Sequence, residues 1–128
     1  MTIELNDTGL WQPLGHINGK WVSAENGITF SVTDPATGAH LADVPDMGAS
    51  ETRLAIDAAN AALPAWRTKT AKERANILRK WFDMCMAAQA DPASLMTREH
   101  GKPPAEARGE VASCASVLAW LHVQGKRI

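Results

Sequence analysis

The residues of this 128-residue chain with the greatest intrinsic reactivity are its two cysteines, Cys85 and Cys114. They lie far apart in sequence and outside any Cys-x-x-Cys spacing, so neither a disulfide framework nor a zinc site is indicated. Each falls in a segment with helical periodicity and apolar neighbours. Apolar surroundings disfavour the thiolate, which is the nucleophilic form of cysteine. We therefore expect both cysteines to pack against other side chains rather than to act as catalytic nucleophiles.

No metal site or phosphate-binding loop is predicted either. The segment from Gly101 to Gly109 is interrupted by two prolines and follows no predicted strand. It therefore matches neither the dinucleotide-binding fingerprint nor the P-loop. The histidines lack the spacing of metal ligands; they are His16, His40, His100 and His122. The sequence thus predicts no catalytic, cofactor-binding or metal-binding residue in this chain.

The charge balance excludes two classes of partner. The 13 Lys and Arg residues nearly cancel the 14 Asp and Glu residues, so no long-range attraction to nucleic acid or to an anionic membrane is expected. The basic stretch over residues 67–80 also contains the acidic Glu73, and such a mixture of charges is typical of a solvated helix face. Residues 1–15 contain no apolar run, which argues against a signal peptide or membrane span and favours the cytoplasm.

The first third of the chain is typical of short hairpins. Asn18-Gly19 favours a type I′ turn, because both residues tolerate positive φ. Residues 28–33 alternate apolar and polar side chains, which predicts a half-buried strand. The segment 34–38, Asp-Pro-Ala-Thr-Gly, is a turn sequence, and residues 40–44 can return as the paired strand.

From Gly48 onward the apolar spacing becomes helical. Ser50 is the expected N-cap of a first helix that turns Leu54 and several alanines inward and ends before Pro64. Thr70 and Glu73 form a capping box for a second helix. This second helix has an unusually wide apolar face made of two stripes. One stripe contains Ala71, Ala75, Leu78, Phe82 and Cys85, and the other contains Ile77, Trp81, Met84 and Ala88.

Two further helices are expected. Asp91 is the predicted N-cap of a short helix with Pro92 at its first position and Gly101 at its end. The last helix starts near Pro104, and over residues 111–123 it is apolar or small almost all round. Such a helix needs cover on every side, and too few residues precede it to provide that cover. We therefore expect this chain to lack part of its packing surface.

Three ordered segments resemble the start of an aldehyde dehydrogenase: residues 17–22, 33–38 and 99–111. Within that family the chain is most similar to succinate-semialdehyde dehydrogenases, through residues 66–75, 77–81, 95–99 and 125–128. The resemblance implies an α/β fold in which antiparallel β-hairpins (14–46) precede α-helices (47–128), after an N-terminal arm (1–13). It implies the N-terminal part of an aldehyde-dehydrogenase-type NAD(P)-binding domain.

The resemblance also implies an activity. Members of this family oxidise an aldehyde with NAD or NADP through a cysteine nucleophile, a glutamate base and an oxyanion hole. In the family these groups, and the residues that bind the dinucleotide, lie downstream of the part that this chain matches. We therefore expect a truncated fragment that by itself is inactive and binds no cofactor.

Two weaker sets of site residues follow from the resemblance. The family's matching helix borders the substrate tunnel, which implies a tunnel wall at Ser113, Val117 and Trp120; semialdehyde enzymes often have an aromatic residue at the first of these positions. Some members bind a monovalent cation through backbone oxygens at the positions of Thr33 and Glu99. Hard cations need several oxygen ligands, and the third contributor lies downstream, so this cation site is incomplete here.

The expected partner is the remainder of the dehydrogenase chain. Two alternatives remain open. The chain could be a non-enzymatic interaction module that docks onto a separate dehydrogenase chain, or it could self-associate through the helix over residues 111–123.

Overall fold

The structure is a computed structural model, and it describes residues 4–125. Residues 1–3 of the predicted arm (1–13) and residues 126–128 of the predicted helical part (47–128) therefore lie outside the described residues. A 3₁₀ turn, η1 (Thr8–Leu10), is followed by two strand pairs and four helices. The strands are β1 (Gly15–Ile17), β2 (Lys20–Val22), β3 (Thr29–Thr33) and β4 (His40–Pro45). The helices are α1 (Ala49–Thr68), α2 (Ala71–Ala87), α3 (Ala90–His100) and α4 (Pro104–Gln124).

The two strand pairs form separate antiparallel sheets, as the turn sequences predict. In the β1–β2 hairpin Asn18 has φ 50° and Gly19 has φ 75°, which confirms the type I′ assignment. In the β3–β4 hairpin the register is irregular between Val32 and Thr33. The prediction that this strand is half-buried is wrong except at Val32, because the other residues of the strand are exposed, Phe30 by 53%.

Helix α1 differs from the prediction at both ends. Its N-cap is Gly48 rather than Ser50, because the Glu51 carboxylate accepts the Gly48 N–H at 2.9 Å. It also continues through Pro64 to Thr68. A proline removes one helical hydrogen bond, but on this exposed helix water can satisfy the carbonyl that loses its partner. Leu54, expected to point inward, is 59% exposed.

The other helices begin and end close to the predicted residues. The Thr70–Glu73 capping box is present at the start of α2. Helix α3 ends at Gly101, whose φ of 69° is the left-handed conformation expected there. Its N-cap is Gln89, not Asp91, because the Asp91 carboxylate is used to bind the N-terminal segment.

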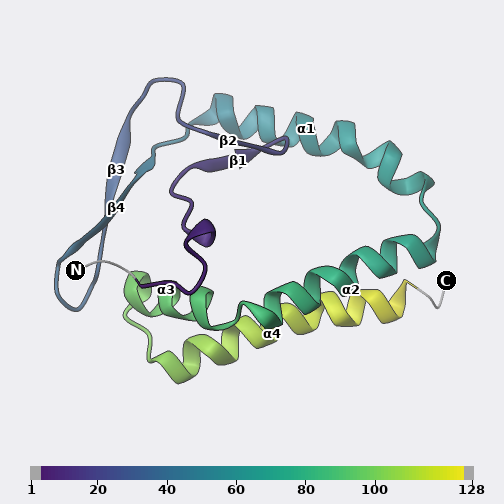
Figure 1. Ribbon diagram of the computed structural model, residues 1–128. Helices are drawn as coiled ribbons and strands as arrows, with labels where there is room; N and C mark the ends of the chain where they lie inside the picture. Colours follow the sequence, from purple (N-terminus) through teal and green to yellow (C-terminus); the bar gives the residue numbers. More distant parts are fainter. Residues whose placement is uncertain (1–3, 126–128) are drawn as a thin grey trace.

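Helices α2 and α4 pack against each other in antiparallel orientation, and α3 lies at one end of the pair (Figure 1). Two hydrogen bonds fix their register. A ring nitrogen of His122 lies 2.7 Å from the Ala75 carbonyl oxygen. At the other end of the pair, the Gln89 amide donates to the Arg108 carbonyl at 3.0 Å.

The described chain is an open frame with very little core. In Figure 1, α1 and the β1–β2 hairpin lie opposite α2 and α4, and the β3–β4 hairpin runs along one side toward α3. Within residues 4–125 the buried apolar residues are all alanines: Ala24, Ala75, Ala93, Ala107 and Ala115. The accessible surface is 8997 Å². A compact protein of 13.8 kDa exposes only about 6,600 Å².

Candidate functional site

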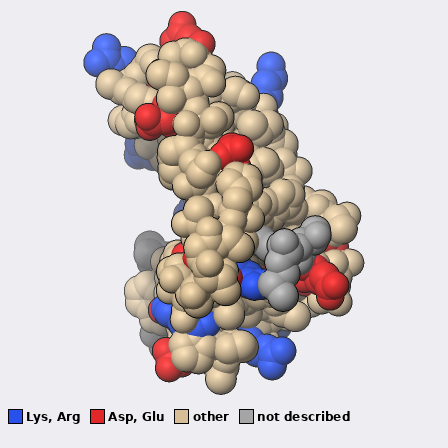
Figure 2. Space-filling view, turned by 90° about the vertical axis from the view of Figure 1, so that its left-hand side faces the viewer, with Lys and Arg blue, Asp and Glu red and all other residues tan. Residues whose placement is uncertain are grey.

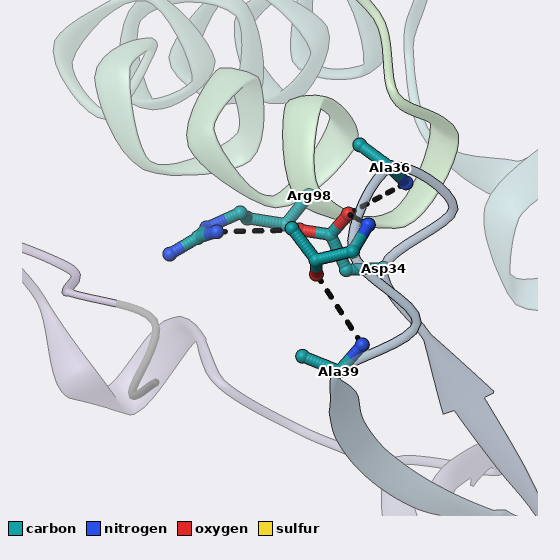
Figure 3. Close-up of polar contacts among 5 residues, drawn as sticks. Asp34, Ala36, Ala39 and Arg98 are labelled. Carbon is teal, nitrogen blue, oxygen red and sulfur yellow. Dashed lines mark hydrogen bonds and ion pairs between the residues drawn. The ribbon is translucent and has the colours of Figure 1, made fainter.

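The carboxylate of Asp34 joins the β3–β4 turn to α3 (Figure 3). Asp34 is 5% exposed. Its carboxylate accepts hydrogen bonds from the N–H groups of Ala36 at 2.8 Å and Thr37 at 3.2 Å, and pairs with the Arg98 guanidinium at 3.2 Å. The Ala36 N–H is the main cause that lowers the pKa of Asp34; burial opposes it, and Thr37 and Arg98 reinforce it. This carboxyl therefore stays ionised and fixes the turn on the helix.

A second contact holds the same junction together. Pro35 packs against Gly101, so that a Cβ added to Gly101 would lie 3.0 Å from the Pro35 Cγ atom. Gly101 thus satisfies two demands at once: the left-handed backbone at the end of α3 and close approach to the turn.

Replacing Gly101 with alanine is expected to destabilise the fold by about 1–2 kcal/mol, because an L-residue is strained in the left-handed conformation. Urea unfolding followed by far-UV circular dichroism measures the effect. Gly109→Ala is the matched control. Gly109 lies inside α4 with nothing near its Cβ position, so alanine there is expected to stabilise by about 0.5–1 kcal/mol. Equal effects of the two substitutions would contradict the role given to Gly101.

The two residues predicted for the cation site adjoin this junction. Thr33 precedes Asp34, and Glu99 follows Arg98, so the ion pair brings the two predicted segments together. The side chains of Thr33 and Glu99 are themselves exposed. Residues 4–125 contain no group of three or more His, Cys, Asp or Glu side chains that could hold a metal ion. The cation site therefore remains a prediction.

The three predicted tunnel residues lie on one face of α4. Ser113, Val117 and Trp120 are spaced as one helical stripe, and all three are exposed, Val117 by 54% and Trp120 by 59%. The other face of α4 packs on α2 and α3 through residues that are buried or half-buried: Val111, Ala115, Leu118 and His122. The described chain thus covers only one side of this all-round apolar helix.

Helix α2 is uncovered in the same way. Its first predicted stripe is buried or half-buried, whereas the second is largely exposed: Ile77 by 45%, Trp81 by 56% and Met84 by 61%. We call this stripe, together with Val117 and Trp120 of α4, the open helix faces. Exposed apolar faces of this kind on a soluble protein mark contacts with other protein. On the side of the molecule where the β3–β4 hairpin lies, Figure 2 shows charged side chains toward both ends and a mostly uncharged surface between them.

A hollow of about 410 Å³ lies where α2, α3 and α4 meet. Cys85 and Cys114 both line it, although they lie 29 positions apart in the sequence. Cys85 is half-buried, but Cys114 is exposed, so the expectation that both thiols are packed is wrong for Cys114. Sequence reasoning missed this juxtaposition because it depends on the register of two helices.

Two other buried carboxylates fix distant segments, and sequence reasoning missed both. Asp91 accepts the N–H groups of Asn6 and Asp7, each at 2.9 Å. Glu51 accepts the Glu25 N–H at 2.8 Å and the hydroxyl of Ser50 at 2.9 Å. The bond from the Glu25 N–H is the main cause that lowers the pKa of Glu51 to about 2. A depressed pKa means that the folded state favours the ionised carboxylate.

Acid is therefore expected to remove the contribution of Glu51 to stability. Its folded pKa of about 2 is below the ordinary 4.5, so the contribution is complete above pH 4.5 and is lost as the pH falls toward 2. Urea midpoints of the original chain and Glu51→Gln should differ at pH 7 and converge in acid. Glu106→Gln, at an exposed position on α4, is the control and should change little. A difference that is independent of pH would contradict this assignment.

Comparison with known proteins decides the family. The model of the aldehyde dehydrogenase family matches residues 21–128, most of the chain. The chain belongs to the aldehyde dehydrogenase family. It is 56% identical over 126 residues to a succinate-semialdehyde dehydrogenase [NADP(+)] of Escherichia coli (strain K12). It is 54% identical over 126 residues to a glutarate-semialdehyde dehydrogenase of Pseudomonas aeruginosa.

Solved structures of aldehyde dehydrogenases agree. An NADP-dependent enzyme from E. coli superposes with a TM-score of 0.94 and 57% identity over 98% of this chain. The succinate-semialdehyde dehydrogenase of Burkholderia pseudomallei gives a TM-score of 0.93 and 51% identity over 97% of this chain. The chain spans 26% of the length of these two structures and of the two relatives above, and it matches their N-terminal portion. This aldehyde-dehydrogenase portion has short antiparallel strand pairs and four helices, as predicted.

The family assignment gives the geometry a context. The Asp34 junction, the Glu51 cap and the Asp91 contact each fix one segment of the frame to another. None of them aligns a nucleophile with a base, as covalent aldehyde oxidation requires. In residues 4–125 no helix is long and apolar enough to cross a membrane.

Proposed function

We propose that this chain serves as the N-terminal portion of an NAD(P)-dependent dehydrogenase that oxidises a semialdehyde, such as succinate semialdehyde, to the carboxylic acid. The observation that carries the proposal is the 56% identity to the E. coli succinate-semialdehyde dehydrogenase over 98% of this chain. The glutarate-semialdehyde relative, at 54%, supports the same class of substrate: a short aldehyde that carries a carboxylate at its other end. The chain alone is proposed to be inactive and to bind neither NAD nor NADP.

The contribution of this portion is structural. Its partner is the remainder of the dehydrogenase, which covers the open helix faces of α2 and α4. The described chain exposes roughly a third more surface than a compact protein of its mass, and much of the apolar part lies on these helices. An apolar surface of this extent is typical of an obligate interface.

The α4 face is proposed as a wall of the substrate tunnel. Ser113, Val117 and Trp120 form one exposed stripe, which supports a shared role in lining a path. Thr33 and Glu99 are proposed to contribute two of the oxygens of a monovalent-cation site that the remainder completes. The proposed compartment is the cytoplasm, in keeping with two free cysteines.

A chimera tests the proposal. Residues 1–128 replace the matching N-terminal quarter of the E. coli relative, and NADP reduction is measured with succinate semialdehyde. The chimera is expected to be active, the original E. coli enzyme is the positive control, and the 128-residue chain alone is expected to reduce no cofactor. A chimera that folds but leaves both succinate and glutarate semialdehyde unoxidised would overturn the proposed function.

The open helix faces also support a second candidate, in which the chain docks onto a separate dehydrogenase polypeptide. The intact mass of the protein from its own source distinguishes the two. A mass roughly four times 13.8 kDa supports the first candidate, because this chain spans 26% of its relatives. A mass of 13.8 kDa, together with a co-purifying dehydrogenase chain, supports the second.

A further inference from the structure

The hollow between α2, α3 and α4 is lined by three sulfur-containing residues that the aldehyde oxidation described above does not use. Cys85 lines it from α2, Met96 from α3 and Cys114 from α4. The rest of its wall is apolar and includes Trp81, Val111 and Leu118. Three polarisable donors in an otherwise apolar hollow are the ligand type that selects soft metal ions.

The helix register places the two cysteines at nearly the same level. The His122–Ala75 contact fits an antiparallel pairing in which Cys85 lies near the level of Ala112. Cys114 is two residues farther along α4, an offset of about 3 Å at 1.5 Å per residue. Buried alanines on both helices, Ala75 and Ala115, allow close approach of the two backbones.

The chemistry of the donors limits the kind of ion. Neither cysteine is in a disulfide, so both sulfur atoms are available as ligands. Within residues 4–125 no third His, Cys, Asp or Glu joins the two thiols, so a hard cation or a four-coordinate zinc ion lacks ligands here. Two thiolates and a thioether suit a monovalent, thiophilic ion of low coordination number. In the isolated 128-residue chain, the exposed Cys114 gives the ion a path from solvent.

We propose that Cys85, Met96 and Cys114 form a binding site for a soft monovalent metal ion, with Cu(I) as its representative. Binding replaces two S–H protons by two Cu–S bonds and releases both protons to solvent. The Met96 thioether donates a lone pair without losing a proton, and copper remains Cu(I) throughout. Affinity therefore rises with pH.

The test is a Cu(I) titration of the 128-residue chain, without oxygen and in competition with a chromogenic Cu(I) chelator. One ion per chain is expected. Cys85→Ser and Cys114→Ser should each abolish binding, and Met96→Leu should weaken it. Met86→Leu is the matched control, because Met86 lies on α2 and does not line the hollow. Far-UV circular dichroism establishes that each variant keeps its helices.

Three results would overturn the site. The first is Cu(I) binding that persists in the double cysteine variant. The second is one Cu(I) held between two chains, detected by light scattering as a metal-dependent dimer. The third is absence of Cu(I) binding by the reduced chain. Each of these outcomes is independent of dehydrogenase activity.

Discussion

Replacing Val117 and Trp120 together with glutamate is expected to have opposite effects in the isolated chain and in the chimera. In the isolated chain both side chains are more than half exposed, so the change removes apolar surface that favours self-association. In the chimera the same face is expected to pack against the remainder of the enzyme. Two unpaired charges buried there should destabilise the fold by several kcal/mol, about 3–5 for each charge that remains uncompensated.

Two measurements separate these effects. Light scattering and binding of an apolar dye follow self-association of the isolated chain, which should decrease in the double variant. Thermal unfolding and NADP reduction follow the chimera, which should lose both stability and activity. Ser116→Glu is a control of the same charge on the same helix, at an exposed position outside the Ser113–Val117–Trp120 stripe. A double variant that leaves the chimera fully stable would show that this face stays in solvent.

The second large effect is expected at Ala75, where α2 meets α4. Ala75 is 1% exposed, and its carbonyl is held by His122, so the facing helices leave no room for a larger side chain. Ala75→Leu should push the two helices apart and destabilise the fold by about 1–3 kcal/mol. Alanine and leucine have similar helix propensities, so the effect reports packing.

Urea unfolding of the chimera measures this effect. The matched control is Ala61→Leu on α1, where the alanine is exposed and the substitution should change stability by less than about 0.5 kcal/mol. If Ala75→Leu is as well tolerated as the control, the α2–α4 contact is looser than the structure indicates.

The outcome at α1 shows where local sequence rules mislead. Pro64 predicts the end of a helix, but the helix continues because its exposed backbone can lose one internal hydrogen bond to water. Ser50 is a good N-cap residue by type, yet the cap is made by Glu51, whose carboxylate also holds the Glu25 N–H. Residue type is a weak predictor of the N-cap where a neighbouring carboxylate accepts both the backbone N–H that precedes the helix and the hydroxyl of the predicted cap residue.

The sequence by itself determined the elements that depend on neighbouring residues. Asn18-Gly19 specified the type I′ turn, Thr70 and Glu73 the start of α2, and Gly101 the end of α3, because each rests on backbone conformation or on a bond within four residues. The apolar pattern of residues 111–123 also indicated a helix that lacks cover. The motifs at residues 17–22, 33–38 and 99–111 indicated the family.

Only the tertiary structure decided which residues meet across long separations. It paired Asp34 with Arg98, anchored the N-terminal segment on Asp91, and placed Cys85 and Cys114 in one hollow. These contacts depend on how the turn, the helices and the N-terminal segment are oriented relative to one another. That orientation is set by packing summed over many side chains, so no local pattern encodes it.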